Sequence, residues 1–341
     1  RHTFNDADTA ISALRSKDVE MVVGAIPFDS DTPAALTVPE AIIREEGPLE
    51  PHAYYRNQSL SSRVVGFDPE PEEHLRRVEA AIGTIETSKL EKVVLARAVD
   101  IEFPEAIDPR LVAARLIDLS ANRDGFIADL SPAGRPGAML VGSSPEVLVK
   151  RQGLTVSAFP LAGSSPRRAL AAEDHLAGQD LLHSSKDLHE HAFVVDHLRR
   201  ALTPLCERLD IPDVPQLIST NEMWHLGTPI SGTLKDKDLT ALELALAAHP
   251  TPAICGTPAE AAQALIETAE TDRGFYAGAV GWCDSSGDGE YMVAIRCAEV
   301  AGDGLSARAW AGGGIVGDSD AQAELEETTA KLRTILKALS L

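Results

Sequence analysis

The sequence predicts an α+β fold, a single large domain of mainly antiparallel sheets flanked by helices. Strand patterns occur in hairpin groups and helical patterns lie between the groups, which is typical of antiparallel sheet. Two hairpin turns stand out, at Ser286-Gly287-Asp288-Gly289 and at Gly302-Asp303-Gly304. Neither a repeat nor a linker divides the 341 residues, so we expect one domain over residues 1–341.

The first half of the chain contains two helices that begin at proline dipeptides. Asp68-Pro69 begins the first, whose apolar residues recur at helical spacing, and Asp108-Pro109 begins the second. Between them, residues 92–101 are apolar on both faces, which predicts a central strand. Short strands follow over residues 125–157, including a hairpin about Gln152-Gly153.

The second half begins with a long helix, predicted from about Ser185 to Leu209. The last helix begins with Asp318 or Ser319 as its N-cap. The elements between them are, in order, strands over residues 216–234, helices over 239–248 and 258–270, and strands over 276–315.

The composition argues against several classes of partner. The chain has 31 Lys plus Arg against 52 Asp plus Glu, a net charge of −21, and nucleic acid or an anionic membrane surface requires a basic footprint. No apolar run reaches the roughly 18 residues of a membrane span, and the first residues do not resemble a signal peptide. We therefore expect a cytoplasmic protein. The cysteines lack any CxxC spacing and are predicted to be buried thiols: Cys206, Cys255, Cys283 and Cys297.

The segment 310–336 carries the most informative pattern. Gly312-Gly313-Gly314 is predicted to form a turn whose exposed N–H groups suit an anion. On the helix that follows, Glu324, Glu327 and Lys331 fall within an arc of about 60°, apart from the leucines. Paired carboxylates suit a hard cation such as Mg²⁺. A solvated helix with a Glu327–Lys331 ion pair fits the same pattern, and this segment alone leaves both interpretations open.

The long helix carries a second pair of acids. By helical angle, Asp187 falls on its apolar stripe and Glu190 lies at the margin of that stripe. A carboxylate there is unfavourable unless it is paired or metal-bound, although Asp187 in the first turn could simply favour the helix dipole. His189 and His191 lie on different faces, which argues against a zinc site. Facing acid pairs on two helices would make a Mg²⁺ site.

Three further charged residues lie in or beside predicted strands. Lys92 begins an apolar strand and is either a strand-end lysine that reaches solvent or, held beside a buried sheet, a base. Glu146 follows a proline turn, where a partly desolvated carboxyl could stay protonated and serve as an acid. Arg296 lies between apolar neighbours and is predicted to pair with a carboxylate of the protein or of a ligand.

Taken together, these segments resemble the chorismate-utilising enzyme family, and most closely its isochorismate synthases. The resemblance is strong over residues 91–338 and loose over residues 1–90. Ten segments match in the same order: KVVLAR, GSSPEVLV, PLAGSSPR, KDLHEH, WHLGTPISG, HPTPAICGTP, RGFYAGAVGW, AIRCAE, AGGGIV and ELEETTAKL.

The resemblance implies a role for each matching position. Lys92 resembles the general base that activates water for attack at C2 of the ring, and Glu146 the general acid that protonates the departing C4 hydroxyl. Glu190 and Glu327 resemble Mg²⁺ ligands, with Asp187 and Glu324 around the metal. The other matching positions resemble substrate contacts: Gly163, Ser164, His225, Ala253, Ile254, Tyr276, Arg296, Gly312, Gly314 and Lys331. Among them, Arg296 and Tyr276 match positions that grip the enolpyruvyl carboxylate.

Differences between members of the family narrow the implied activity. Anthranilate synthases lack the lysine at position 92 and use ammonia from a glutaminase partner, so no glutaminase subunit is expected here. One type of aminodeoxychorismate synthase places a nucleophilic lysine where this chain has Ala162. Salicylate synthases share the lysine and the acid but often have Thr at the position of Ala253.

The resemblance therefore implies a Mg²⁺-dependent, monomeric isochorismate synthase with chorismate as its substrate. Two alternatives stay open: a salicylate synthase, which would release pyruvate, and a regulator that binds chorismate or Mg²⁺ without catalysis. Whether the product serves menaquinone, a siderophore or salicylate is also left open by the sequence.

Overall fold

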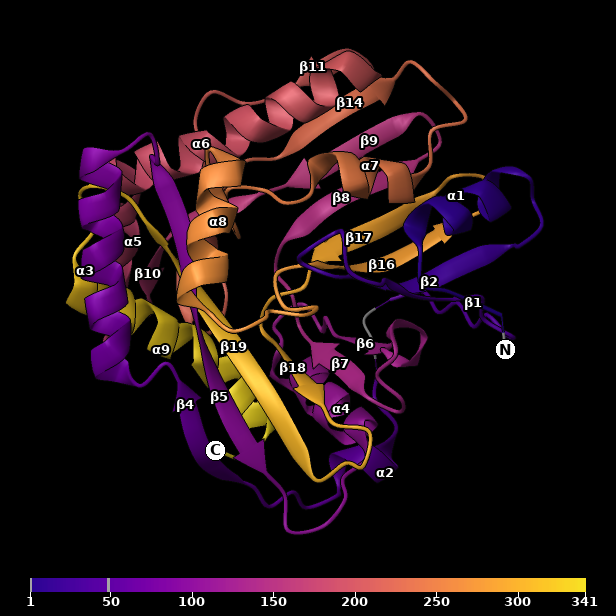
Figure 1. Cartoon of the computed structure of the whole chain (residues 1–341), viewed down its shortest axis with the longest axis horizontal. Coiled ribbons are helices and arrows are strands. Elements are labelled where there is room, and N and C mark those ends of the chain that lie inside the picture. The colour runs from indigo at the N-terminus through magenta and orange to yellow at the C-terminus, as the bar shows by residue number, and fades with distance from the viewer. Residues whose placement is uncertain (1, 48–49) are drawn as a thin grey trace.

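The computed structural model describes residues 2–47 and 50–341 and confirms the predicted α+β fold (Figure 1). Strands in this part of the chain form three sheets, and the pairings within them are antiparallel. None of the helices described is both long enough and apolar enough to cross a membrane. All four cysteines are buried free thiols, as predicted.

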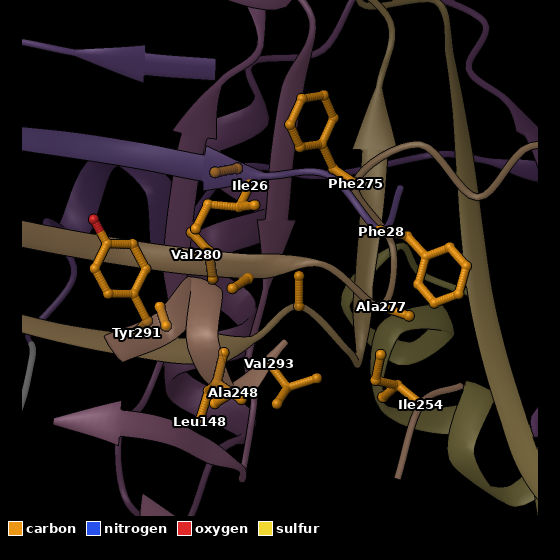
Figure 2. Close-up of a cluster of buried hydrophobic side chains, with 14 of the residues drawn as sticks. Ile26, Phe28, Leu148, Ala248, Ile254, Phe275, Ala277, Val280, Tyr291 and Val293 are labelled. Atoms are coloured by element: carbon orange, nitrogen blue, oxygen red, sulfur yellow. The ribbon is translucent and has the colours of Figure 1, made fainter. Parts of the chain in front are cut away.

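The largest sheet joins the N-terminal strands to the hairpins of the middle and the end of the chain. Its strand order is β1 (Thr3–Phe4), β3 (Ala35–Thr37), β2 (Met21–Ile26), β16 (Ala279–Asp284), β17 (Gly289–Val293), β8 (Val147–Gln152), β9 (Thr155–Phe159), β14 (Ile230–Leu234) and β11 (Cys206–Asp210). Helix α7 (Ala241–Ala248) packs across β8, β16 and β17, and α1 (Ala7–Arg15) packs beside it. Figure 2 shows Leu148, Val280 and Tyr291 gathered in this part of the core.

The second sheet carries Lys92 and the glycine run of the candidate site. Its strand order is β15 (Gly256–Thr257), β5 (Lys92–Glu102), β19 (Ser306–Ile315), β18 (Cys297–Val300), β7 (Met139–Gly142) and β6 (Phe126–Asp129), and β4 (Arg63–Asp68) also pairs with β5. Helices α9 (Ala321–Ala338), α3 (Pro71–Thr87) and α4 (Pro109–Leu119) pack together on one side, with the short α2 (Ala53–Arg56) against α4. Helix α8 (Ala259–Ala269) packs against β5 and β15.

The third sheet is small and lies beneath two helices. It contains β10 (Leu161–Pro166), β13 (Met223–Gly227) and β12 (Gln216–Ser219) in that order. Helices α5 (Ala171–His183) and α6 (Ser185–Leu202) pack on it. Buried residues Val194, Leu198 and Leu202 place the apolar stripe of α6 against the core, as the sequence predicted.

Several predicted helix boundaries were wrong. Helix α3 begins at Pro71, two residues after the predicted Asp68-Pro69 start. Helix α6 ends at Leu202, because Pro204 interrupts the hydrogen-bond pattern and a 3-10 turn leads directly into β11. Asp320, not Asp318 or Ser319, caps α9 by accepting the N–H of Ala323. The sequence reading missed α5, whose apolar residues do not form a clear stripe.

Candidate active site

The candidate active site lies where β19 extends beyond its neighbour β18. Strand β18 pairs only with residues 307–309 of β19, whereas β5 accompanies β19 as far as Ile315. One edge of β19 is therefore free of strand pairing from about Ala311 onward. This free edge faces β10, the connection between β17 and β18, and helix α9, so three sheets and a helix meet around one cavity.

The cavity gathers most of the residues predicted from the sequence. It has a volume of about 50 Å³, and its lining includes Ile254, one of the core residues labelled in Figure 2. Twelve predicted residues line it: Glu146, Gly163, Ser164, Glu190, His225, Ala253, Ile254, Tyr276, Arg296, Gly312, Gly314 and Lys331. Lys92, Asp187, Glu324 and Glu327 lie outside this lining.

The glycine run is not a turn, contrary to the prediction. Gly312, Gly313 and Gly314 lie inside β19 and pair with Ala96, Leu95 and Val94 of β5. Gly312 O accepts a hydrogen bond from Lys331 Nζ at 2.9 Å, so the backbone of Gly312 points to the free edge. Because N–H and C=O of one residue point the same way in an antiparallel strand, the N–H groups of Gly312 and Gly314 face the cavity. The predicted supply of N–H donors thus comes from a strand edge.

The glycines also allow side chains to approach β19 closely. A Cβ atom on Gly314 would lie 2.0 Å from Glu190 Oε1 and 3.0 Å from Lys92 Cε. A Cβ atom on Gly313, on the other face of the strand, would lie 3.0 Å from Glu324 Oε2. The missing side chains therefore leave room for two carboxylates on opposite faces of one strand end.

Lys92 is completely buried, so it does not reach solvent. Its Nζ lies 3.0 Å from Glu190 Oε1, an ion-pair distance without hydrogen-bond geometry. Burial raises the pKa of Glu190, but the charges of Lys92 and Lys186 outweigh that effect and hold the pKa below its usual value. Lys92 and an ionised Glu190 thus form a buried pair at the end of the cavity, beside Gly314.

The second pair of acids lies on α9. Glu324 is buried and accepts a hydrogen bond from Lys186 Nζ at 2.8 Å through Oε1, while its Oε2 has no partner in the described part of the chain. Burial and the neighbouring Glu327 raise the pKa of Glu324 to about 7. Lys331 Nζ lies 2.5 Å from Glu327 Oε1 while also lining the cavity. Lys331 therefore forms the predicted ion pair with Glu327 and also lines the cavity, while its contact with substrate stays a prediction.

Asp187 lies in the first turn of α6 and contacts Ser184, the N-cap residue. It lines a shallow groove of about 430 Å³ that shares Ser164 with the cavity. Burial and the charges of Glu190 and Glu327 raise the pKa of Asp187, opposed by Ser184 and Lys186. The position of Asp187 at a helix N-terminus fits the helix-dipole explanation, and its place around a metal ion stays a prediction.

Glu146 occupies an environment unlike that of Glu190. It is 3% exposed, and Oε1 accepts the backbone N–H of Leu161 at 3.2 Å. Burial raises its pKa to about 7, even though Leu161, Lys92, Lys331 and Arg296 act in the opposite direction. No side chain forms a close ion pair with Glu146 in the residues that the structure describes. A carboxyl of this kind holds a proton near neutral pH and can donate it.

Arg296 is a buried cation that forms no ion pair with a carboxylate of the described residues. It lies between β17 and β18 with φ of +52°, not within a strand as predicted, and this kink turns its side chain into the cavity. Its Nη2 lies 3.5 Å from His225 Nε2, and no carboxylate of the described residues lies within 4.0 Å. Burial, Arg296 and Lys331 hold the pKa of His225 well below its usual value, so this histidine is neutral.

Aromatic and hydrogen-bonding residues surround this arginine. Tyr276 stacks on Trp310 with ring centroids 5.6 Å apart and an interplanar angle of 7°. Ser164 Oγ lies 2.9 Å from His225 Nδ1. Trp310 was not predicted as a site residue, although its place directly before the glycine run could have suggested it. A cation, a phenol and a hydroxyl thus converge where an anionic ligand group would bind.

The sequence reading also missed two residues that stabilise the site. His191 Nδ1 lies 3.0 Å from Ala162 O, and its Nε2 lies 2.7 Å from Thr228 Oγ1, so it joins α6 to the strand that carries Gly163 and Ser164. Lys186 was noted only as part of the KDLHEH segment. Each has a polar contact partner distant in sequence, which no local pattern reveals.

The acidic residues suit Mg²⁺ in chemistry but do not form a ready-made cage. No group of three or more His, Cys, Asp or Glu side chains within residues 2–47 and 50–341 is arranged to hold a metal ion. Lysine ammonium groups lie beside the carboxylates instead. The unpartnered, buried Oε2 of Glu324 is nevertheless the kind of oxygen that a hard cation would satisfy.

A larger groove of about 1400 Å³ lies elsewhere, over β2, β16, β6 and β7. Its lining is mainly apolar and includes Met21, Met139, Trp282 and Met292. It lacks the convergent acid, base and cation of the smaller cavity. The larger volume of this groove is therefore not a reason to place the active site there. The smaller cavity is the better candidate because it gathers the charged and titratable side chains.

Comparison with known proteins supports this choice. Residues 29–340 match the family model described as "Chorismate binding enzyme". The chain belongs to the chorismate binding enzyme family. Isochorismate synthase DhbC of Bacillus subtilis (strain 168) is 44% identical over 323 residues, 94% of this chain and 80% of that protein.

Two further relatives of this chorismate binding enzyme cover nearly the whole chain. A MenF protein of Mycobacterium tuberculosis (strain CDC 1551 / Oshkosh) is 46% identical over 99% of this chain and 91% of that protein. The crystal structure of DhbC from Bacillus anthracis is 38% identical, with a TM-score of 0.91 over 100% of this chain and 91% of that one. The family therefore extends across the fold described above.

The close approach at Gly314 leads to a testable prediction. Gly314→Ala would push Glu190 Oε1 away, because the two atoms would otherwise lie 2.0 Å apart. We expect a folded protein whose affinity for chorismate, measured by isothermal titration calorimetry, falls at least ~10-fold. Gly83→Ala is the control, since a Cβ atom there meets nothing within 4 Å and should slightly stabilise α3. Unchanged affinity in Gly314→Ala would contradict this role of the glycine.

Proposed function

We propose that the protein converts chorismate into isochorismate. The observation that carries this proposal is a carboxyl with a raised pKa in the cavity lining, Glu146, together with a buried lysine, Lys92, that lies 3.0 Å from Glu190 of the same lining. A base and an acid in unequal environments are required to exchange a hydroxyl between two ring carbons. The name of the Bacillus subtilis relative supports the same reaction.

The residues divide the proposed reaction between them. Lys92, which acts as the neutral amine in this step and as the ammonium before and after it, accepts a proton from water as the water oxygen bonds to C2. The double bonds shift, and Glu146 donates a proton to the C4 hydroxyl, which leaves as water. One water enters and one leaves, so the product is an isomer of the substrate. Such an exchange needs no redox partner and no ammonia, and we propose that the chain acts as a monomer without a glutaminase subunit.

Substrate binding follows from the charges of the cavity. Chorismate carries two carboxylates, and the protein as a whole carries a net charge of −21. Arg296, Tyr276 and the N–H groups at the β19 edge would bind the enolpyruvyl carboxylate. Lys331 and Ser164 line the same cavity and would contact the rest of the substrate.

We further propose that Mg²⁺ serves the ring carboxylate. Glu190 and Glu327 would bind the ion directly, with Asp187 and Glu324 around it through water, as hard cations prefer. When bound, Mg²⁺ supplies charge neutralisation and orientation of that carboxylate. The buried, unpartnered Oε2 of Glu324 supports this assignment.

The product distinguishes the proposed function from its closest rival. An isochorismate synthase leaves the enolpyruvyl group in place, whereas a salicylate synthase releases pyruvate. Purified protein incubated with chorismate and Mg²⁺ should form isochorismate, which chromatography detects. A lactate dehydrogenase-coupled assay of the same reaction should detect no pyruvate. Stoichiometric pyruvate would establish the salicylate activity instead. Chorismate binding without any product would indicate a regulator.

The acid–base assignment predicts the effect of two substitutions. Lys92→Ala and Glu146→Gln remove proton transfer, so we expect kcat to fall by ~10²–10⁴-fold in each. Lys150→Ala and Glu290→Gln, which alter partly exposed residues of β8 and β17, serve as matched controls. Near-full activity of Lys92→Ala would overturn the assignment of the base, and that of Glu146→Gln the assignment of the acid.

The raised pKa of Glu146 predicts a pH dependence. Because Glu146 must be protonated to act as the acid, kcat/KM for chorismate should fall as the pH rises through about 7. The residual activity of Glu146→Gln should not show this fall, since its side chain does not titrate. Initial rates between pH 5.5 and 9 measure both profiles. A fall that persists unchanged in Glu146→Gln would assign the titration to another group.

A further inference from the structure

Each of three glutamates in the site is held by a different lysine. Lys92 Nζ lies 3.0 Å from Glu190, Lys186 Nζ lies 2.8 Å from Glu324, and Lys331 Nζ lies 2.5 Å from Glu327. The lysines come from β5, α6 and α9 respectively, so three separate elements supply the pairing. This arrangement neutralises the acids that would serve a metal ion.

The acidic side chains of the proposed metal site equal in number the lysines beside them together with Arg296. Together with Asp187, the three glutamates make four acidic side chains, and Arg296 joins the three lysines to make four cationic ones. Mg²⁺ alone would add two positive charges to this set. A dicarboxylate would add two negative charges, so the ion and the substrate together would add no net charge. Binding of Mg²⁺ alone is therefore favoured when a protein cation moves away.

Of the three lysines, Lys186 is the one that can leave. Lys92 is completely buried, and Lys331 is also anchored to Gly312 O. The side chain of Lys186 is 25% exposed, and Glu324 is its one hydrogen-bond acceptor in the described part of the chain. Lys186 is the second residue of α6, so rotation of its side chain disturbs no core packing.

The surroundings of Lys186 resemble those of a bound cation. Burial disfavours its charge, but Glu324, Glu190 and Glu327 together outweigh burial and raise its pKa. These three acids belong to both helices of the proposed metal site. The ammonium group therefore occupies the field that Mg²⁺ would occupy, and Glu324 keeps one oxygen without a partner.

We propose that Lys186 is an exchangeable counter-cation, whose ammonium holds Glu324 while the metal is absent and moves into solvent when Mg²⁺ binds. This inference rests on the Mg²⁺ part of the proposed function. Lys186 acts on the metal site through Glu324 and is a positioning residue. Because Mg²⁺ must displace the Lys186 ammonium, the affinity of the free protein for Mg²⁺ is lower than it would be without this lysine.

The first experiment removes the competing cation. Lys186→Met keeps a stem of similar length without the charge, and isothermal titration calorimetry with MgCl₂ alone should show about tenfold tighter binding than in the unaltered protein. In EDTA the variant should melt at a lower temperature than the unaltered protein, because Glu324 loses its cation and keeps only the hydrogen bond from Ser319. Mg²⁺ should raise the melting temperature of the variant by more. Lys337→Met is the control, since that lysine pairs with Glu222 and not with the four acids.

The second experiment follows Lys186 in the unaltered protein and does not depend on a variant that folds. Brief acetylation with acetic anhydride and peptide mass spectrometry should show several-fold faster modification of Lys186 in saturating Mg²⁺ than in EDTA. The exposed Lys337 should react at equal rates in both. Mg²⁺ binding with unchanged acetylation of Lys186, or with no gain in affinity in Lys186→Met, would overturn this inference alone. Absence of Mg²⁺ binding in both proteins would overturn the metal proposal and this inference together.

Discussion

The buried contact between Lys92 and Glu190 is the interaction on which the rest of the site depends. A fully buried ammonium group is unfavourable unless a carboxylate lies beside it, and Glu190 reaches that position only because Gly314 has no side chain. The pair joins β5 to α6 beside Gly314, at the end of β19 where the strand edge is free.

The backbone prepares the cavity as much as the side chains do. Strand β18 ends while β19 continues, which leaves N–H groups of the glycine run unpaired by a neighbouring strand. Arg296 has a positive φ and interrupts the extended chain between β17 and β18. Gly163, with φ of +80°, interrupts the extended conformation within β10. These departures from regular sheet occur together at one cavity, where irregular backbone serves ligand binding.

Environment gives three glutamates of the site different protonation behaviour. Lys92 and Lys186 keep Glu190 ionised. Glu146 forms no ion pair with the residues that the structure describes, and burial raises its pKa to about 7. Glu324 has both a lysine and a neighbouring acid, and its pKa also rises to about 7. An ionised carboxylate suits a cation, and a protonated one suits proton donation. The proposed division of labour thus follows from desolvation and charge, not from residue type.

The sequence by itself determined the fold class, the hairpin turns, the start of α4 and the residue types of the site, because these depend on patterns over a few neighbours. Resemblance to a family brought Lys92, Glu146 and the acids together as one expected site. Only the tertiary structure decided that the glycine run is strand, that Arg296 sits in a kink, and which lysine pairs with which glutamate. Those features depend on strand pairing and desolvation between segments up to about 220 residues apart, such as β5 and β19, whose partners include Val93 and Ile315. Local periodicity carries no information about contacts of that kind.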